Sequence, residues 1–134
     1  MTTSAFVLLL FIGWTLALLV LMELLRSMQV LSGRRRSNEF KPDNANLSPF
    51  MQRLARAHAN CIESLPVIGG LLLVAILLQR TDMTDPLAPW LLAARIAQSS
   101  IHLASLSVMA VNARFTFFVV QLAIAAYWLL ALLR

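Results

Sequence analysis

Charged and amide side chains recur at helical spacing within three stretches of the chain that are otherwise apolar. Spacings of three, four or seven residues place each set on one face of a helix. An ionisable group inside a membrane span is costly unless it faces a protein partner or a wet cavity, which makes these side chains candidate functional residues. They are Arg56, Asn60 and Glu63 in the first stretch, Arg95, Gln98 and His102 in the second, and Arg114 and Gln121 in the third.

The chemistry of this set points to a small ligand that carries several charges. Arginines bind carboxylates, a carboxylate binds an ammonium group, and amides pair with peptide groups. The set therefore suits a zwitterionic or polyanionic ligand. The chain has no HExxH, GxSxG, phosphate-binding glycine loop or CxxC motif, so metal, serine-hydrolase and nucleotide chemistry are unsupported. Its one cysteine, Cys61, has no disulfide partner and is interpreted as a small buried residue rather than a reactive thiol.

The elements that position these side chains are predicted to be membrane-spanning helices. The chain has 134 residues, a single domain's worth, with 60% hydrophobic residues, 13% charged residues and a mean hydropathy of +0.78, which do not suit a water-soluble globule. Four segments approach the ~20 apolar residues that a helix needs to cross a bilayer. We therefore expect an all-α, four-helix integral membrane bundle over residues 1–134, with helices at about 3–29, 49–80, 87–111 and 114–133 and a polar loop at about 30–48.

The distribution of basic residues predicts the orientation in the membrane. Seven of the 11 lysines and arginines lie between the uncharged apolar segments 2–22 and 64–79 of the first two predicted helices. Basic residues accumulate in short cytoplasmic loops, so we expect the loop at 30–48 to be cytoplasmic and both termini to be outside. The run Arg34-Arg35-Arg36 is interpreted as an orientation signal in contact with anionic lipid, and nucleic acid is not an expected partner.

Two charge pairs leave alternatives open. Arg95 needs a counter-charge inside the membrane, and Glu63 is the most economical partner, either in a buried pair that only pins two helices together or as part of a ligand site. Glu23 and Arg26 lie three residues apart at the end of the first helix, and a surface ion pair is favoured over a ligand contact.

Two further side chains also admit a structural interpretation. Arg114 is predicted to stand at the start of the fourth helix, where free N–H groups and the macrodipole favour an anion. Alternatively, it is an interfacial anchor whose side chain extends to the headgroups. His102 taken alone is more typical of a core histidine, and its place on the Arg95 face is what makes it a ligand candidate.

Three motifs resemble those of the MAPEG family, the membrane-associated proteins in eicosanoid and glutathione metabolism. They are Arg56-Ala57-His58-x-Asn60-x-x-Glu63, Arg95-Ile96-Ala97 and Asn112-Ala113-Arg114-Phe115-Thr116-Phe117-Phe118. The resemblance, to a bacterial-type member, covers nearly the whole chain. It implies a homotrimer of four-helix subunits in the bacterial inner membrane, with glutathione held between subunits near the cytoplasmic side.

The resemblance also implies roles for individual residues. Asn60 and Glu63 match the family's glutathione contacts, Arg56 and Arg95 match its second-helix and third-helix arginines, and Arg114 stands near the arginine associated with the glutathione thiolate. A guanidinium group beside a helix N-terminus lowers the pKa of a thiol, which makes Arg114 the predicted catalytic residue. The predicted glutathione-binding set is completed by Gln98, His102 and Gln121.

The expected function is a glutathione-dependent membrane transferase or peroxidase that acts on hydrophobic electrophiles, with glutathione as co-substrate. A lipophilic small molecule or lipid would arrive from the bilayer. The alternative is a non-catalytic lipid-binding or scaffold protein of the same fold, as in the family's lipoxygenase-activating branch. A small transporter is a weaker interpretation. Eicosanoid isomerase activity is disfavoured because the chain departs from prostaglandin synthase-like members at Ala59, Gln98, His102 and Phe118.

Overall fold

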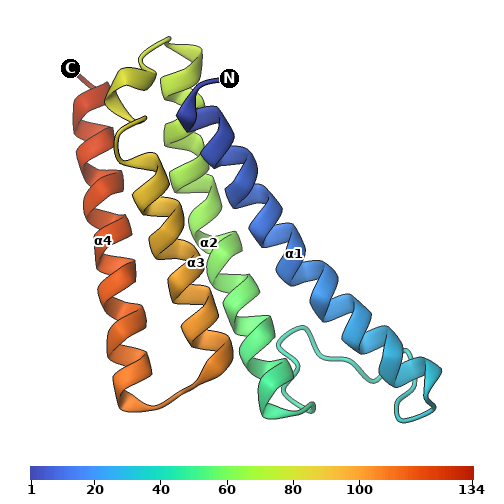
Figure 1. The fold of residues 1–134 in the computed structure, drawn as a ribbon. Helices are drawn as coiled ribbons and strands as arrows, with labels where there is room; N and C mark the ends of the chain where they lie inside the picture. The colour runs from blue at the N-terminus through green and yellow to red at the C-terminus, as the bar shows by residue number, and fades with distance from the viewer.

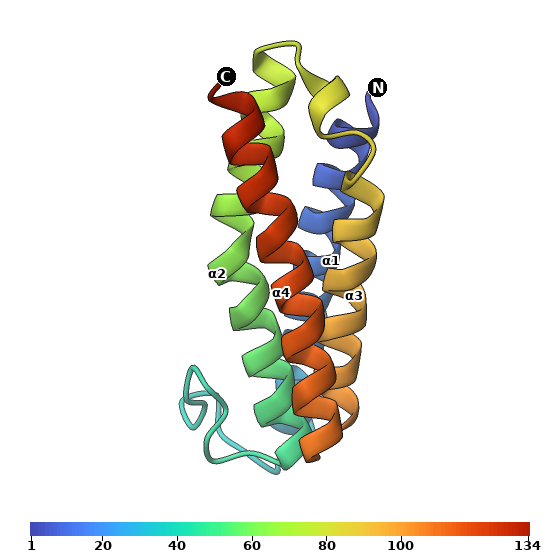
Figure 2. The same ribbon diagram turned by 90° about the vertical axis from the view of Figure 1, so that its left-hand side faces the viewer.

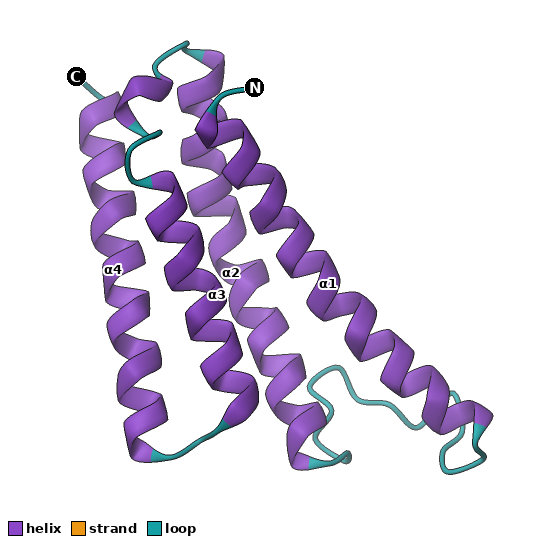
Figure 3. Ribbon diagram, viewed as in Figure 1, coloured by secondary structure: helices purple, strands orange, loops and turns teal.

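Four long helices and one short 3-10 helix make up the computed structural model, which describes residues 1–134 and contains no strand. Both termini lie at one end of the bundle, here called the terminal end, and the segment 32–48 lies at the opposite end, here called the loop end (Figures 1 and 3). The all-α, four-helix prediction is confirmed. The elements are α1 (Thr3–Leu31), α2 (Pro49–Leu77), η1 (Thr81–Met83), α3 (Ala88–Ala104) and α4 (Val108–Leu132).

Three of the four predicted spans, α1, α2 and α4, are long and apolar enough to cross a membrane. The remaining long helix, α3, has only 17 residues, or about 26 Å at 1.5 Å per residue. It falls short of the ~20 apolar residues that a span requires. In Figure 2, α4 lies over the seam between α2 and α3. The polar side chains Arg95, Gln98 and His102 of α3 are buried.

The boundary between α3 and α4 differs from the prediction. The third helix ends at Ala104 rather than near 111, and the fourth begins at Val108 rather than 114. Two serines cause the break, because the Ser107 N–H donates to Ser105 Oγ at 3.0 Å and Ser107 Oγ accepts from the Ala110 N–H at 3.2 Å. Serine side chains compete in this way with the helical backbone and begin a new helix as its N-cap. The bounds of α1 and α2 differ from the prediction by only a few residues.

The interior contains two apolar clusters, one in each half of the bundle. The cluster in the terminal half includes Phe11, Leu72 and Trp128, each fully buried. The cluster in the loop half includes Leu54 and Cys61. Cys61 is fully buried, which confirms its interpretation as a small core residue. Burial of these side chains supplies the main force that holds α1 against α2 and α3.

Two polar contacts close the terminal end of the bundle. The Ser4 backbone N–H and hydroxyl donate to Asp85 Oδ1 at 2.7 and 2.6 Å, so a carboxylate satisfies donors in the first turn of α1. Arg80 donates to the carbonyl oxygens of Leu132 at 3.1 Å and Ala131 at 3.0 Å. These carbonyls belong to the last turn of α4, where a cation is favourable. The loop that carries η1 therefore fixes the ends of α1 and α4.

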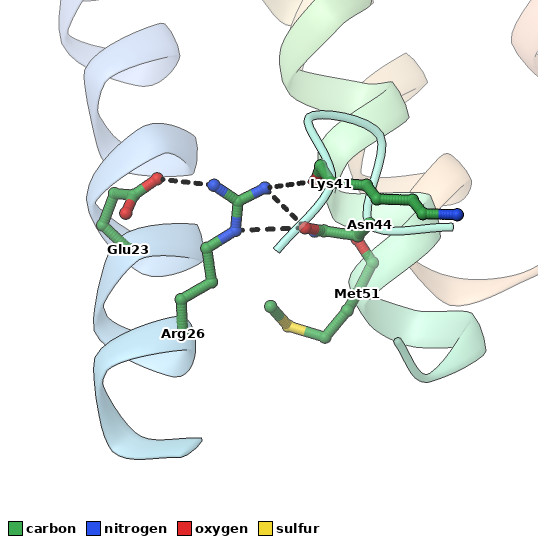
Figure 4. Close-up of polar contacts among 5 residues, drawn as sticks. All are labelled: Glu23, Arg26, Lys41, Asn44 and Met51. Carbon is green, nitrogen blue, oxygen red and sulfur yellow. Dashed lines mark hydrogen bonds and ion pairs between the residues drawn. The ribbon is translucent and has the colours of Figure 1, made fainter. Parts of the chain in front are cut away.

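At the loop end, Arg26 connects α1 to the segment that follows it (Figure 4). Its Nη1 donates to Glu23 Oε1 at 3.1 Å, its Nε to Asn44 Oδ1 at 3.0 Å and its Nη2 to the Lys41 carbonyl at 3.1 Å. Asn44 in turn donates from Nδ2 to the Met51 carbonyl at 2.8 Å. The predicted Glu23–Arg26 ion pair is present, and all three guanidinium nitrogens of Arg26 are bound by protein acceptors. Arg26 thus anchors the loop between α1 and α2.

Asn44→Ala is expected to destabilise the folded protein by about 2–4 kcal/mol, because it removes the hydrogen bonds of Asn44 with the charged Arg26 side chain and the Met51 carbonyl and strains the backbone. Asn44 is fully buried and has φ of 56°, a left-handed conformation that alanine tolerates poorly. Thermal unfolding in detergent, followed by circular dichroism, measures the effect. Asn44→Gly removes the same hydrogen bonds without the backbone strain, so it should fall between wild type and Asn44→Ala. Wild-type stability in both variants would contradict the anchoring role.

Candidate functional site

A crevice of about 470 Å³ opens between α2, α3 and α4. It exists because α4 packs along α3 and touches α2 far less, which leaves a groove between α2 and α4 with α3 as its floor. Its volume falls within the range of ~300–1,000 Å³ typical of ligand sites. Seven of the eight residues singled out in the sequence line it: Arg56, Asn60, Glu63, Arg95, Gln98, Arg114 and Gln121.

The eighth residue, His102, does not line the crevice. Its side chain is only 4% exposed, in the last turn of α3. The crevice lies on the turns of α3 that carry Arg95 and Gln98, whereas His102 follows one turn later, where the helix ends and the chain turns into α4. The shared face was predicted correctly, but the crevice stops short of His102. The structure favours the alternative of a core histidine.

The α2 wall of the crevice carries an ion pair that differs from the predicted one. Glu63 Oε1 lies 3.8 Å from Arg56 Nη1 on the same helix, and no ion pair joins Glu63 to Arg95. Both side chains are well exposed, at 63% for Arg56 and 64% for Glu63. The expected Arg95–Glu63 pair is therefore wrong. Glu63 projects outward from α2 beside Arg56, while Arg95 is buried on the floor.

The floor of the crevice holds a buried guanidinium group with no counter-charge. Arg95 is 1% exposed, and its Nε and Nη2 have no hydrogen-bond partner. Its guanidinium carbon lies 5.7 Å from the centroid of the Phe11 ring, a cation–π contact that compensates only part of the cost of burial. A buried charge without hydrogen-bonded partners is strongly unfavourable. Arg95 is thus a strong candidate for binding an acceptor group of a ligand.

A second polar group on the floor is a bridge between two amide side chains. Gln121 Nε2 donates to Gln98 Oε1 at 2.9 Å and to the Phe117 carbonyl oxygen at 3.0 Å. Gln121 is 1% exposed and Gln98 is 8% exposed. The bridge joins α3 to α4, the two helices that share the most extensive contact in the bundle.

The α4 wall carries Arg114, which is partly buried and forms no ion pair. Its Nε is buried without a hydrogen-bond partner. Because α4 begins at Val108, Arg114 lies within the second turn of the helix rather than at its N-terminus. The predicted contribution of the helix macrodipole to anion binding at Arg114 is therefore wrong, since that effect falls off within the first turn. Arg114 would therefore bind an anionic ligand through its own guanidinium charge alone.

The remaining lining residues were missed by the sequence reasoning. They share helix faces with the predicted polar residues, and helical spacing is the signal that would have found them. Phe118, for example, lies four residues after Arg114 and three before Gln121. The full set is Ser64, Val67, Ile68, Val111, Phe115, Phe118, Leu122 and Ala125.

Along α2 the lining of the crevice changes from polar to apolar. Arg56 and Asn60 line it near the loop end, and Val67 and Ile68 line it further along the same face of α2. From Arg56 to Ile68 the lining extends about 18 Å at 1.5 Å per residue. On α4, apolar Val111 and Phe115 flank Arg114, so the crevice offers charged and apolar contacts side by side.

Elsewhere in the molecule, a second hollow lies at the loop end beside Glu23, Arg26 and Phe40. Its two charged residues bind each other, and Arg26 also binds the loop. No group of three or more histidine, cysteine or acidic side chains is arranged to hold a metal ion. The crevice between α2, α3 and α4 is therefore the principal candidate site.

Fold and crevice together define a multi-pass α-helical membrane protein with a crevice lined by charged residues between α2, α3 and α4. The model of the MAPEG family matches residues 4–134, nearly the whole chain. The chain therefore belongs to the MAPEG family. Comparison with curated proteins and with solved structures gave no match.

Proposed function

We propose that the protein is a glutathione-dependent membrane transferase or peroxidase that acts on hydrophobic electrophiles. One observation carries the proposal: three arginines and one carboxylate line a single crevice that also carries apolar side chains. Glutathione carries two carboxylates, one ammonium group and a thiol, so its charges complement this lining. Members of the family are commonly glutathione-dependent, which agrees with the chemistry of the crevice.

In this proposal each charged residue of the crevice has a distinct partner on glutathione. Glu63 binds the ammonium group, Arg56 and Arg95 bind carboxylates, and Asn60 binds a peptide group. Arg114 stabilises the thiolate, which is the nucleophilic form of glutathione. His102 is not part of the proposed site because it lies outside the crevice.

The reaction then needs only an acceptor from the bilayer. In conjugation, the thiolate sulfur forms a bond to an electrophilic carbon, and the leaving group departs with its electron pair. In peroxide reduction, the sulfur attacks one oxygen of the hydroperoxide and the O–O bond breaks, which gives an alcohol and glutathione sulfenic acid. A second glutathione converts the sulfenic acid to glutathione disulfide and water. The apolar side chains that line the crevice, among them Val67 and Ala125, would hold the acceptor.

The exposed charges on α2 support an oligomer with the site between subunits, and the family resemblance makes a homotrimer the proposed form. Arg56 and Glu63 are each more than 60% exposed on a helix apolar enough to span a membrane. Charged groups facing lipid are costly, so a neighbouring subunit that covers this face would remove the cost. The orientation we propose places the loop end in the cytoplasm. Chemical crosslinking and native mass spectrometry in detergent test the trimer, and a monomeric, active protein would contradict it.

The proposed activity is tested on the purified protein in detergent, with glutathione and either chlorodinitrobenzene or a lipid hydroperoxide. Turnover of either acceptor supports the proposal. The apolar side chains of the crevice also fit a non-catalytic lipid-binding or scaffold protein of the same fold. Glutathione or lipid binding without turnover of any acceptor would favour that second function.

Glu63→Gln is expected to weaken glutathione binding about tenfold or more, since the ammonium group loses a charge-assisted partner. Isothermal titration with glutathione measures the affinity, and native mass spectrometry reports whether trimer stability falls with it. Glu39→Gln is the matched control, because Glu39 is an exposed carboxylate of the loop that does not line the crevice. Normal affinity and normal assembly in Glu63→Gln would exclude Glu63 from the site.

A further inference from the structure

The ring of Phe11 on α1 contacts the Arg95 side chain from outside the crevice. The Arg95 guanidinium carbon lies 5.7 Å from the centroid of this ring. Phe11 is fully buried and does not line the crevice, so a ligand in the crevice does not touch it. It belongs to the buried face of α1, together with Val7, Thr15 and Leu18. Through this contact α1, the one long helix that contributes no residue to the lining, reaches a charged group of the site.

Hydrogen bonds do not fix the orientation of the Arg95 guanidinium group. Its Nε and Nη2 atoms are buried without a partner. The Cys61 thiol beside it is only a weak acceptor. Gln121 Oε1, a buried acceptor of the same crevice, also has no partner and so receives no hydrogen bond from Arg95. The contact with the aromatic ring is therefore the specific interaction that holds the guanidinium group in place.

A ring contact suits a guanidinium group that must stay free to bind a ligand. An aromatic ring attracts the cation through its face and uses none of the N–H groups, which remain available as donors. A side chain that is already held in place does not have to be ordered when the ligand binds, so the ligand binds more tightly. The other arginines with a ring contact differ, because Arg26 and Arg53 also donate hydrogen bonds to the protein.

We propose that Phe11 is a positioning residue of the glutathione site, because its ring holds the Arg95 guanidinium group where a carboxylate of the ligand can bind it. This role rests on the proposed function, in which Arg95 binds a glutathione carboxylate. A weaker ring contact leaves Arg95 free to turn toward the unpartnered Gln121 Oε1, and the ligand then has to displace it from that acceptor. Phe11 thus raises the affinity for glutathione without touching it.

Fluorinated phenylalanines at position 11 test this role, since each added fluorine weakens the attraction of the ring for a cation with little change in size. Replacing Phe11 with mono-, di- and trifluorophenylalanine should raise the Kd for glutathione step by step, by about threefold or more for the trifluoro ring. Isothermal titration measures the Kd. Turnover at saturating glutathione should stay within about twofold of wild type, because the ring does not touch the reacting atoms. Phe11→Leu, which has no ring, should bind glutathione at least as weakly as the trifluoro variant.

Phe50→trifluorophenylalanine is the matched control. Phe50 makes the same kind of contact, with the Arg53 guanidinium carbon 5.9 Å from its ring centroid, and neither residue lines the crevice. This change should leave the Kd for glutathione unaltered. An unchanged Kd across the Phe11 series, even with lower thermal stability, would show that the ring serves only the fold, and tighter binding would show that it competes with the ligand. Either result overturns the inference alone, whereas a wild-type protein that binds no glutathione overturns the proposed function with it.

Discussion

Arg114→Ala is expected to lower glutathione-dependent turnover at least about 100-fold while leaving the bundle and its assembly intact. Arg114 is only partly buried, forms no ion pair and has a buried Nε without a partner. Its removal therefore costs the fold little. A thiolate in the crevice would lose the nearest positive charge on α4, so the population of the nucleophilic form would fall.

The ultraviolet absorbance of bound thiolate separates this effect from a loss of binding. Wild-type protein with glutathione should show thiolate absorbance that Arg114→Ala lacks, and Arg114→Lys should recover part of it through charge alone. Arg34→Ala is the matched control, because Arg34 is an exposed arginine of the loop outside the crevice. Full activity in Arg114→Ala would remove Arg114 from the mechanism.

Arg95→Met is expected to stabilise the protein without ligand and to abolish its stabilisation by glutathione. The wild-type side chain is 1% exposed, with Nε and Nη2 unpaired, so its burial is costly in the absence of a ligand. Replacing a buried charge with an apolar side chain of similar size is often stabilising, by about 1–4 kcal/mol. A ligand that binds only the folded state raises its stability, and this increase should disappear with the guanidinium group.

Thermal unfolding with and without glutathione measures both effects in one experiment. Arg80→Met is a useful contrast, because Arg80 donates to two carbonyls at the end of α4 and its loss should destabilise the protein. A destabilised Arg95→Met protein without ligand would show that Arg95 holds the helices together. That outcome would restore the structural interpretation that the charge pattern left open.

Helical spacing predicted which polar side chains share a face, and this accounts for all the charged and amide residues of the candidate site. Seven of the eight predicted residues meet in one crevice. The prediction failed where it depended on how far the crevice extends along a helix face, or on which charged residue lies nearest to another. His102 has the correct spacing from Arg95 but lies beyond the end of the crevice, and Glu63 pairs with Arg56 on its own helix rather than with Arg95.

The helix boundaries show a related limit. Hydropathy predicted a third span to about residue 111, whereas α3 ends at Ala104. Leu106, Val108 and Met109 are apolar, so a hydropathy pattern continues through them although the helix does not. Ser105 and Ser107 carried the missing signal, but serine is tolerated in membrane helices, and only the observed hydrogen bonds show that here it begins a new one.

The sequence by itself determined the all-α membrane class, the MAPEG resemblance and the composition of each polar face, because these follow from local hydropathy and helical period. The tertiary structure decided that α4 packs on α3 and leaves a groove beside α2, that Arg95 Nε and Nη2 are buried without a hydrogen-bond partner, and that Gln121 bridges to Gln98. Burial and pairing depend on which helices touch. Local spacing contains no information on those contacts between distant segments.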